Sequence, residues 1–167
     1  IASYRKFLNH NDNEINLKEL GSHQHGLIRI KVSERYNKTS INEKIGQILF
    51  NTAQYFNGNT LELGTSLGVS CLYFSQALND KSITTIDINS IENIIEPYND
   101  YFKNVIFKTG RFDDEIPLFC SENITQKVVF IDGNHTFEST TTYFRFIEKI
   151  LEKESVVIID DIRYNSE

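Results

Sequence analysis

The sequence has no methionine and no tryptophan, and it holds only two cysteines in 167 residues. Cys71 and Cys120 stand far apart, so they form neither a metal-binding motif nor a disulfide framework. We interpret both as small buried hydrophobic residues of a protein in the reducing cytoplasm. Because the chain begins at Ile1 and lacks methionine throughout, we expect it to be a fragment of a longer protein.

Long apolar runs and an excess of basic charge are also absent. No run approaches the ~20 residues that a membrane-spanning helix needs, and no signal peptide is visible at the start. The net charge is -6, whereas nucleic acid or an anionic membrane would require a basic face. With 40% hydrophobic and 24% charged residues, we expect a globular cytoplasmic domain with neither nucleic acid nor membrane as a partner.

From residue 40 onward, strand-like and helix-like segments alternate. Ser40 with Glu43 forms a capping box before a helix predicted to reach Phe56 and to be ended by Gly58. Short apolar strands are predicted at 59–63, 82–87, 104–108, 127–132 and 155–160. Helices are predicted at 68–78, from about 90, at 113–121 (a short helix or loop) and at 136–152. This alternation predicts a doubly wound α/β fold with a mostly parallel sheet.

Residues 1–39 read differently, because they are polar and contain a single strand-like run, Leu27–Val32. We predict an N-terminal polar or helical extension, or a lid, attached to a domain of residues 40–167. His23 and His25 belong to this segment. They are interpreted as part of a solvated polar loop, with a lid over a ligand as the alternative.

Ligands of doubly wound sheets bind beyond the carboxyl ends of the strands, so we expect the functional residues at the strand ends. The first strand runs into Glu-Leu-Gly-Thr-Ser-Leu-Gly-Val-Ser at 62–70. Gly64 and Gly68 allow a tight turn and the close approach of a ligand, and the helix that follows offers free N–H groups. The spacing is neither Gly-x-Gly-x-x-Gly nor a P-loop. A purely structural turn explains this piece equally well.

The second and third strands end in residues that suit a nucleoside. Asp87 ends the second strand, where an acid can accept hydrogen bonds from a ribose diol; the alternative is that Asp87 or Asn89 caps the next helix. Phe112 and Asp113 follow the third strand. They could flank an adenine, although a solvated loop with Asp113 as a helix cap is the simpler interpretation.

The fourth and fifth strands end in acids. Asp132 follows the fourth strand, and Asp160 and Asp161 follow the fifth. Neighbouring parallel strands bring these carboxylates together, and they repel unless a cation lies between them. Oxygen ligands favour Mg²⁺, Ca²⁺ or Mn²⁺. His135 stands close by as a candidate general base; the alternative is that the acids cap the following elements and His135 bonds locally.

Taken in order, these motifs resemble the class I S-adenosylmethionine-dependent methyltransferases, over about residues 44–167. The residues that carry the likeness are 62–70, Asp87, Phe-Ile-Asp-Gly-Asn-His at 130–135 and Ile-Ile-Asp-Asp at 158–161. They are most similar to small-molecule O-methyltransferases of the catechol, caffeoyl-CoA and macrolide-sugar type. Catechol and caffeoyl-type enzymes have an amide at the position of Asp161 and a lysine at that of His135. These two residues look more like the sugar-modifying branch.

The resemblance implies an enzyme with a Rossmann-like fold that methylates a small hydroxylated molecule. The implied S-adenosylmethionine-binding residues are Glu62, Gly64, Thr65, Ser66, Gly68, Ser70, Asp87, Ile88, Phe112, Asp113 and Asp132. The implied ligands of Mg²⁺ or another divalent cation are Asp132, Asp160 and Asp161, and the implied catalytic residues are His135 and Asp132. The family's sheet continues past its fifth strand, usually with an antiparallel strand pair, which we expect this chain to lack.

Two other functions stay open. A non-catalytic adenosylmethionine-binding or interaction domain would bind the cofactor without metal and would not need His135. An NAD-dependent oxidoreductase is disfavoured, because the turn lacks a third glycine. The sequence does not identify the methyl acceptor or the oligomeric state, and a homodimer is one assembly that the chain could form.

Overall fold

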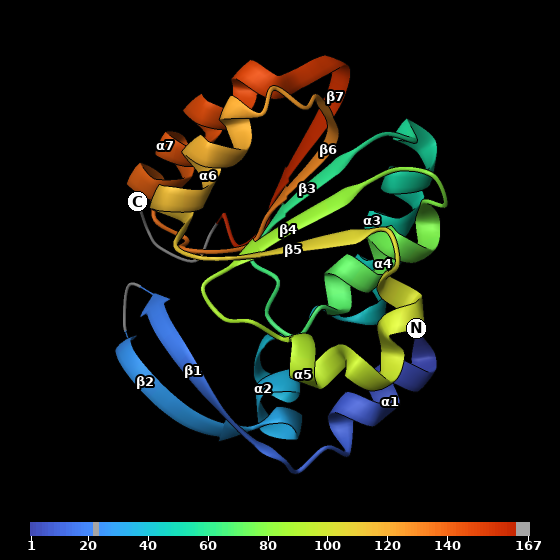
Figure 1. Cartoon of the computed structure of the whole chain (residues 1–167), viewed down its shortest axis with the longest axis vertical. Coiled ribbons are helices and arrows are strands. Elements are labelled where there is room, and N and C mark those ends of the chain that lie inside the picture. The colour runs from blue at the N-terminus through green and yellow to red at the C-terminus, as the bar shows by residue number, and fades with distance from the viewer. Residues whose placement is uncertain (22–23, 163–167) are drawn as a thin grey trace.

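The computed structural model describes residues 1–21 and 24–162, without the side chains of residues 20, 21, 24 and 25. His23 and the side chain of His25 therefore lie outside the described part of the chain. The described residues form a five-stranded parallel sheet with helices on both faces and, beside it, a two-stranded antiparallel hairpin (Figure 1). The predicted doubly wound α/β fold is confirmed. Among the described helices, none has the length and apolar character needed to cross a membrane.

The elements alternate along the chain as expected for this fold. The first four are α1 (Ala2–Asn9), β1 (Glu14–Gly21), β2 (Gln24–Lys31) and α2 (Val32–Thr39). The next group is α3 (Glu43–Phe56), β3 (Thr60–Leu63), α4 (Val69–Ala77), β4 (Ile83–Asp87), α5 (Glu92–Ile95) and the 3-10 helix η1 (Glu96–Phe102). The last group is β5 (Val105–Thr109), α6 (Phe112–Ser121), β6 (Gln126–Ile131), α7 (Phe137–Ile147), the 3-10 helix η2 (Glu148–Ile150) and β7 (Leu151–Ile159).

The strand order β5-β4-β3-β6-β7 puts β3 at the centre of the sheet. Leu63, the last residue of β3, pairs with Ile86 of β4 on one side and with Ile131 of β6 on the other. Because all the strands are parallel, their carboxyl ends meet at one edge. The register therefore brings the turn after β3, the end of β4 and the acids after β6 and β7 to the same edge.

Two hydrophobic cores hold the sheet between its helices. One packs the α1, α3, α4 and η1 side, with Tyr4, Leu49, Phe74 and Phe130 among its buried residues. The other packs the α6 and α7 side, with Leu63, Ile116, Phe119 and Ile147. Burial on both faces agrees with the continuous apolar strands that the sequence shows.

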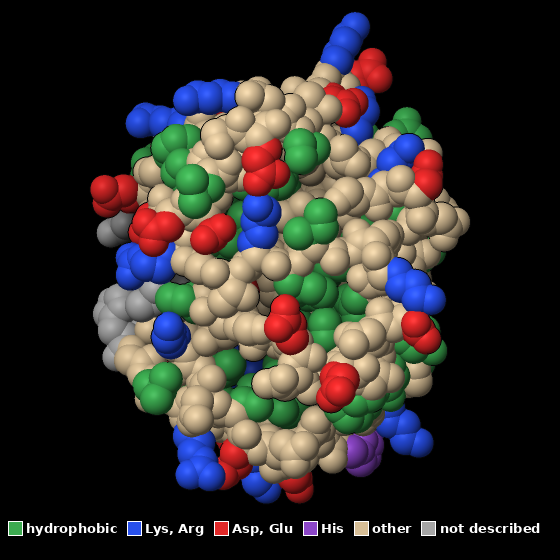
Figure 2. Space-filling view, in the orientation of Figure 1, with side chains coloured by type: hydrophobic (Ala, Val, Ile, Leu, Met, Phe, Trp, Pro, Cys, Tyr) green, Lys and Arg blue, Asp and Glu red, His purple; other side chains and the backbone are tan. Residues whose placement is uncertain are grey.

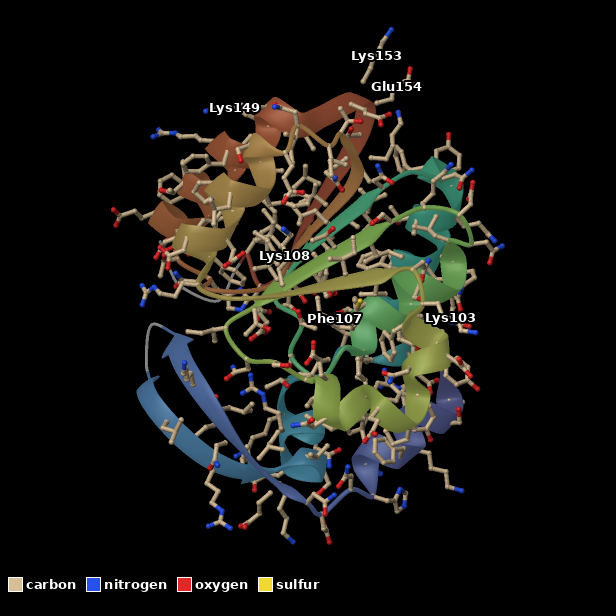
Figure 3. All side chains as sticks on the ribbon, viewed as in Figure 1. Lys103, Phe107, Lys108, Lys149, Lys153 and Glu154 are labelled. Atoms are coloured by element: carbon tan, nitrogen blue, oxygen red, sulfur yellow. The ribbon has the colours of Figure 1, made fainter. Side chains whose placement is uncertain are left out.

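The edge strand β5 illustrates how alternate residues serve the two faces. Phe107 points toward the α4 side (Figure 3), where its ring lies 5.8 Å from that of Phe102. Lys108 points toward α6 and pairs with Glu122 at 2.8 Å. Beside Phe107, α5, η1 and β5 enclose an open groove of about 550 Å³. Figure 2 shows hydrophobic side chains at the bottom of a hollow over this part of the face.

The ends of two helices differ from the predictions. Asn42, not Ser40, caps α3, because its Oδ1 accepts a hydrogen bond from the Ile45 N–H at 3.0 Å. The helix ends at Phe56, as predicted, but the residue that caps it is Asn57, which takes the left-handed conformation (φ 44) expected of Gly58. The helix predicted over 136–152 is also too long, since α7 ends at Ile147 and β7 already begins at Leu151.

The N-terminal segment is more structured than its polar composition indicated. It forms two helices and the β1–β2 hairpin, whose strands pair from Glu14 with Lys31 to Gly21 with Gln24. Tyr4 and Leu8 of α1 are fully buried in the larger core. The aromatic rings of Tyr4 and Phe102 lie 5.6 Å apart. The segment therefore packs against the helices of the sheet domain.

Candidate active site at the carboxyl edge of the sheet

The turn after β3 comes close to the neighbouring strand end. Gly64 has φ 105, and a Cβ placed on it would collide with the main-chain oxygen of Asp132. Any other residue at this position would force β3 and β6 apart. Gly68 has φ 72 and stands directly before α4, so the main-chain N–H groups at the start of this helix face the turn. The backbone of this turn thus lies directly against the main chain of Asp132.

Asp87 ties this turn to the end of β4. Its Oδ2 accepts a hydrogen bond from the main-chain N–H of Ser66 at 2.9 Å, and its Oδ1 accepts one from that of Asn89 at 2.9 Å. Neither Asp87 nor Asn89 caps α5, because the residue before that helix is Ile91. Each carboxylate oxygen can accept a further hydrogen bond. Asp87 is therefore held in place by the turn and can still accept from a ligand.

Glu62 lies buried beneath the turn, within a short chain of polar groups. Thr65 and Thr85 join their hydroxyls at 2.6 Å, and the Thr85 hydroxyl donates to Glu62 Oε2 at 2.5 Å. The other oxygen, Oε1, accepts no hydrogen bond of good geometry from the described residues. Burial raises the pKa of Glu62 to about 8, although hydrogen bonding from Ser70 and Thr85 opposes this shift. In its ionised form, Glu62 can accept a hydrogen bond on Oε1 from an ammonium donor, and such a cation would favour the charged form.

The start of α6 contributes an aromatic side chain to this edge of the sheet. The Phe112 ring lies 5.5 Å from the ring of Tyr143, edge to face. A Cβ on Gly133 would come within 2.7 Å of the Phe112 ring, so this ring also borders the loop after β6. Asp113 is exposed in the first turn of α6 and pairs with Arg111 at 3.2 Å. Phe112 thus lies at the site edge, whereas the Asp113 carboxylate pairs with the guanidinium group of Arg111.

The acids after β6 and β7 lie near the same edge of the sheet. The main-chain N–H of Asp160 donates to the oxygen of Ile131 at 2.9 Å, which aligns the two strand ends. Burial, and then the nearby charges of Asp160, Asp161 and Asp87, raise the pKa of Asp132 to about 7. His135 Nε2 lies 3.9 Å from Asp132 Oδ1 and 3.9 Å from Asp161 Oδ2. The imidazole therefore lies between two of the three carboxylates.

A cation is the group that this charge pattern would favour, but the described side chains do not converge on one. Within residues 1–21 and 24–162, no group of three or more His, Cys, Asp or Glu side chains is arranged to hold a metal ion. Carboxylate oxygens are suitable ligands for Mg²⁺. The donor chemistry thus fits a divalent cation, whereas the side-chain arrangement does not.

Three polar residues of this edge were not identified from the sequence. Thr85 binds the Glu62 carboxylate, and the strand register that pairs these two residues is the signal that could have found it. Asn134 donates to Ser139 Oγ at 2.8 Å and to the Tyr143 hydroxyl at 3.2 Å, which fixes the loop that carries His135. Asn89 binds the N-terminal hairpin, and no local pattern announces such a contact.

A mostly apolar cavity of about 400 Å³ adjoins the acids, between α7 and the end of β7. Its volume is that of a small-molecule site. Aromatic and aliphatic side chains form one part of its wall, and the acids and the histidine form another. The residues that show this division are Phe137, Phe144, Ile159, His135, Asp160 and Asp161.

Comparisons with known proteins agree with this architecture. A family model described as a methyltransferase domain matches residues 61–162. No curated protein has a sequence that matches the chain.

Solved structures with the same fold are methyltransferases. The O-methyltransferase TomG of Streptomyces achromogenes, in complex with SAM, has a TM-score of 0.67 at 22% identity over 75% of this chain and 58% of its own. An O-methyltransferase of Bacillus cereus in complex with SAH has a TM-score of 0.66 at 22% identity, over 75% and 59%. The SAH-bound methyltransferase PaMTH1 of Podospora anserina has a TM-score of 0.62 at 19% identity, over 76% and 56%. The chain thus spans under three fifths of the length of these three proteins.

Proposed function

The chain belongs to the methyltransferase domain family, and on that basis we propose that it transfers a methyl group from S-adenosylmethionine to a hydroxyl oxygen of a small molecule. One observation carries the proposal: the Ser66 N–H of the glycine turn is hydrogen bonded to Asp87 at 2.9 Å. This bond joins the turn and the strand-end acid into one preformed surface. The SAM and SAH complexes of TomG and of the Bacillus cereus enzyme, which share the fold, support this cofactor.

The described residues fit the parts of this cofactor. Asp87 would accept from the ribose hydroxyls, and Phe112 would cover the adenine. The free Oε1 of Glu62 would receive the ammonium group of the methionine part, next to the turn that Gly64 opens. The remaining turn and strand-end residues that we propose for this site are Thr65, Ser66, Gly68, Ser70, Ile88, Asp113 and Asp132.

The bound cofactor supplies an electrophilic methyl group on a sulfonium centre. The protein's task is then to hold the acceptor oxygen in line with that methyl group, because positioning provides much of the rate of a displacement. The apolar wall of the 400 Å³ cavity would hold the body of the acceptor. His135, at its polar end, would take the hydroxyl proton onto Nε2 as a general base, and Asp132 and Asp161 would stabilise the resulting imidazolium.

We further propose that a divalent metal ion assists the transfer. Asp132, Asp160 and Asp161 are the candidate ligands of Mg²⁺, although among the described residues no three His, Cys, Asp or Glu side chains are arranged to hold a metal ion. A chelator tests this part of the proposal: methyl transfer that survives EDTA would refute metal assistance.

The experiment that tests the function is calorimetric titration of the protein with S-adenosylhomocysteine, with and without Mg²⁺, followed by methyl transfer to a panel of hydroxylated small molecules. We expect micromolar binding and transfer to oxygen. Binding without transfer would favour a non-catalytic adenosylmethionine-binding domain. An absence of binding in either condition would refute the proposed function.

A further inference from the structure

The β1–β2 hairpin is anchored to the site edge by one side chain. Asn89 Oδ1 accepts from the main-chain N–H of Lys18 at 2.8 Å, and Asn89 Nδ2 donates to the main-chain oxygen of Lys18 at 3.0 Å. The amide thus pairs with β1 much as a neighbouring strand would. Because a hydrogen bond donor and an acceptor are matched at once, the amide of Asn89 fits in one orientation only.

The same residue continues into the cofactor edge. The main-chain N–H of Asn89 donates to Asp87 Oδ1 at 2.9 Å, while Asp87 Oδ2 accepts from Ser66 of the glycine turn. An unbroken series of hydrogen bonds therefore leads from the middle of β1, through Asn89 and Asp87, to the turn after β3. A shift of the hairpin would therefore reach Asp87 through two successive hydrogen bonds, Lys18 to Asn89 and Asn89 to Asp87.

Other contacts of the N-terminal segment fall on the same turn. Thr39, the last residue of α2, joins its hydroxyl to that of Ser66 at 3.1 Å. The buried hydroxyl of Tyr4 donates to the main-chain oxygen of Leu67 at 2.7 Å. Three separate elements of residues 1–39 thus bond to Asn89, to Ser66 or to Leu67, which all lie in the loops at this edge. This convergence is more than packing of an extension against a domain would require.

We propose that Asn89 is a positioning residue that couples the β1–β2 hairpin to Asp87, so that anchoring of the hairpin and binding of the cofactor strengthen each other. The proposal rests on the proposed function, because it takes Asp87 as the cofactor's ribose acceptor. A two-stranded hairpin is only marginally stable by itself, so its place is set by such anchors. Coupling of this kind is reciprocal: what the anchored hairpin adds to cofactor affinity, the cofactor adds to anchoring.

Two variants break the link from opposite sides. Asn89→Ala removes the amide, which pairs with Lys18 and also donates a long hydrogen bond of 3.4 Å to Asp87 Oδ1, but keeps the main-chain N–H that holds Asp87 at 2.9 Å. Lys18→Pro removes the N–H that faces Asn89 and leaves Asn89 itself intact; proline is tolerated where an edge-strand N–H faces outward. Asn16→Pro is the matched control, because residue 16 lies two positions earlier with the same main-chain direction and does not bond to Asn89.

The measurements are the dissociation constant of S-adenosylhomocysteine, hydrogen exchange of residues 14–19 with and without it, and the midpoint of urea unfolding. We expect about fivefold weaker binding in Asn89→Ala and in Lys18→Pro, the effect of one ordinary hydrogen bond, with no further loss in the double variant. In the natural chain and in Asn16→Pro, the ligand should slow exchange of residues 14–19. In Asn89→Ala it should not.

The outcomes separate this proposal from the function on which it rests. If the natural chain binds S-adenosylhomocysteine and Asn89→Ala binds it equally well, the coupling is refuted and the function stands. A lower unfolding midpoint with unchanged affinity would make Asn89 a structural residue only, which also refutes the coupling. If the natural chain does not bind the ligand, both proposals fall.

Discussion

At the scale of single residues, Asp87 has the largest number of roles at the site edge. Its two oxygens hold the glycine turn through Ser66 and the following loop through Asn89, and we propose that they also receive the ribose. A carboxylate in this position organises the backbone before a ligand arrives. Its loss should therefore affect binding more than the number of direct ligand contacts indicates.

We predict that Asp87→Ala weakens binding of S-adenosylhomocysteine by at least about tenfold, because hydrogen bonds to a charged acceptor are stronger than neutral ones. Calorimetric titration measures this change. Asp100→Ala is a suitable control, since Asp100 is exposed and pairs only on the surface with Lys103. Equal affinities of Asp87→Ala and the natural chain would remove Asp87 from the site.

His135 should affect turnover rather than binding. We expect His135→Ala to lower the rate of methyl transfer by about 10²–10⁴-fold, the usual contribution of a general base, while affinity for S-adenosylhomocysteine stays within about twofold. Steady-state kinetics with the best acceptor provide the comparison. His10→Ala, on the exposed end of α1, should behave like the natural chain. Full activity of His135→Ala would exclude this residue as the base.

Glu62 makes stability depend on pH. Its pKa is raised from 4.5 to about 8 by burial, so between these values the folded state keeps a proton that the unfolded state releases. The contribution of Glu62 to the free energy of unfolding is therefore fully present below about pH 4.5. It is lost as the pH rises toward 8, by up to about 1.4 kcal/mol per pH unit.

Glu62→Gln should flatten this dependence and stabilise the protein at pH 8, although it removes the negative charge that we propose for the ammonium group. Urea unfolding at pH 5, 6.5 and 8 measures the slope for each variant. The exposed Glu138→Gln should leave the slope unchanged. A Glu62→Gln variant with the natural slope would show that another group dominates.

At the scale of elements, the cap of α3 gives a direct test of local structure. Asn42→Ala should lower the free energy of unfolding by about 1 kcal/mol, because it removes the side-chain oxygen that accepts from the Ile45 N–H. Ser40→Ala should have a smaller effect, since Ser40 takes an extended conformation at the end of α2. Urea denaturation of both variants decides between them, and the opposite order would restore Ser40 as the cap.

The elements of the sheet could be predicted because their signals are local. The runs around Val128 and Ile158 are apolar throughout, and the helices between strands repeat their apolar residues at helical spacing. The end of α7 was misplaced because Leu151 continues the helical spacing of Ile147, although it begins β7. Here pairing with Gln126 of β6 overrides the local pattern.

The N-terminal segment could not be read in this way. Tyr4 and Leu8 stand with Phe7 in a short and mostly polar stretch, and the burial of Tyr4 and Leu8 depends on η1 and α4, far along the chain. Of the proposed site, the strand-end residues followed from the parallel topology. The residues that hold these strand-end residues in place could not be predicted. Asn89 bonds to Lys18 and Thr85 bonds to Glu62 across sequence distances that no motif spans.

At the scale of the whole molecule, a ligand that binds only the folded state should raise the temperature of unfolding. At a concentration about 100 times its dissociation constant, S-adenosylhomocysteine should stabilise the protein by about 2.7 kcal/mol, which corresponds to roughly 5–10 °C for a domain of this size. A thermal scan with NAD at the same concentration is the control. A shift with NAD and none with S-adenosylhomocysteine would favour an oxidoreductase.

The central place of β3 also has a consequence for the order in which the protein assembles. Thr60 pairs with Ile83, which follows soon after it during synthesis, and with Val128, which emerges much later. Half of the sheet can thus form before the strand that completes its middle exists, and closing so distant a pair is slow. Since the glycine turn meets the main chain of Asp132 only after β6 has docked, the cofactor pocket is a late product of folding. We therefore expect the cofactor to stabilise the finished protein without speeding its formation.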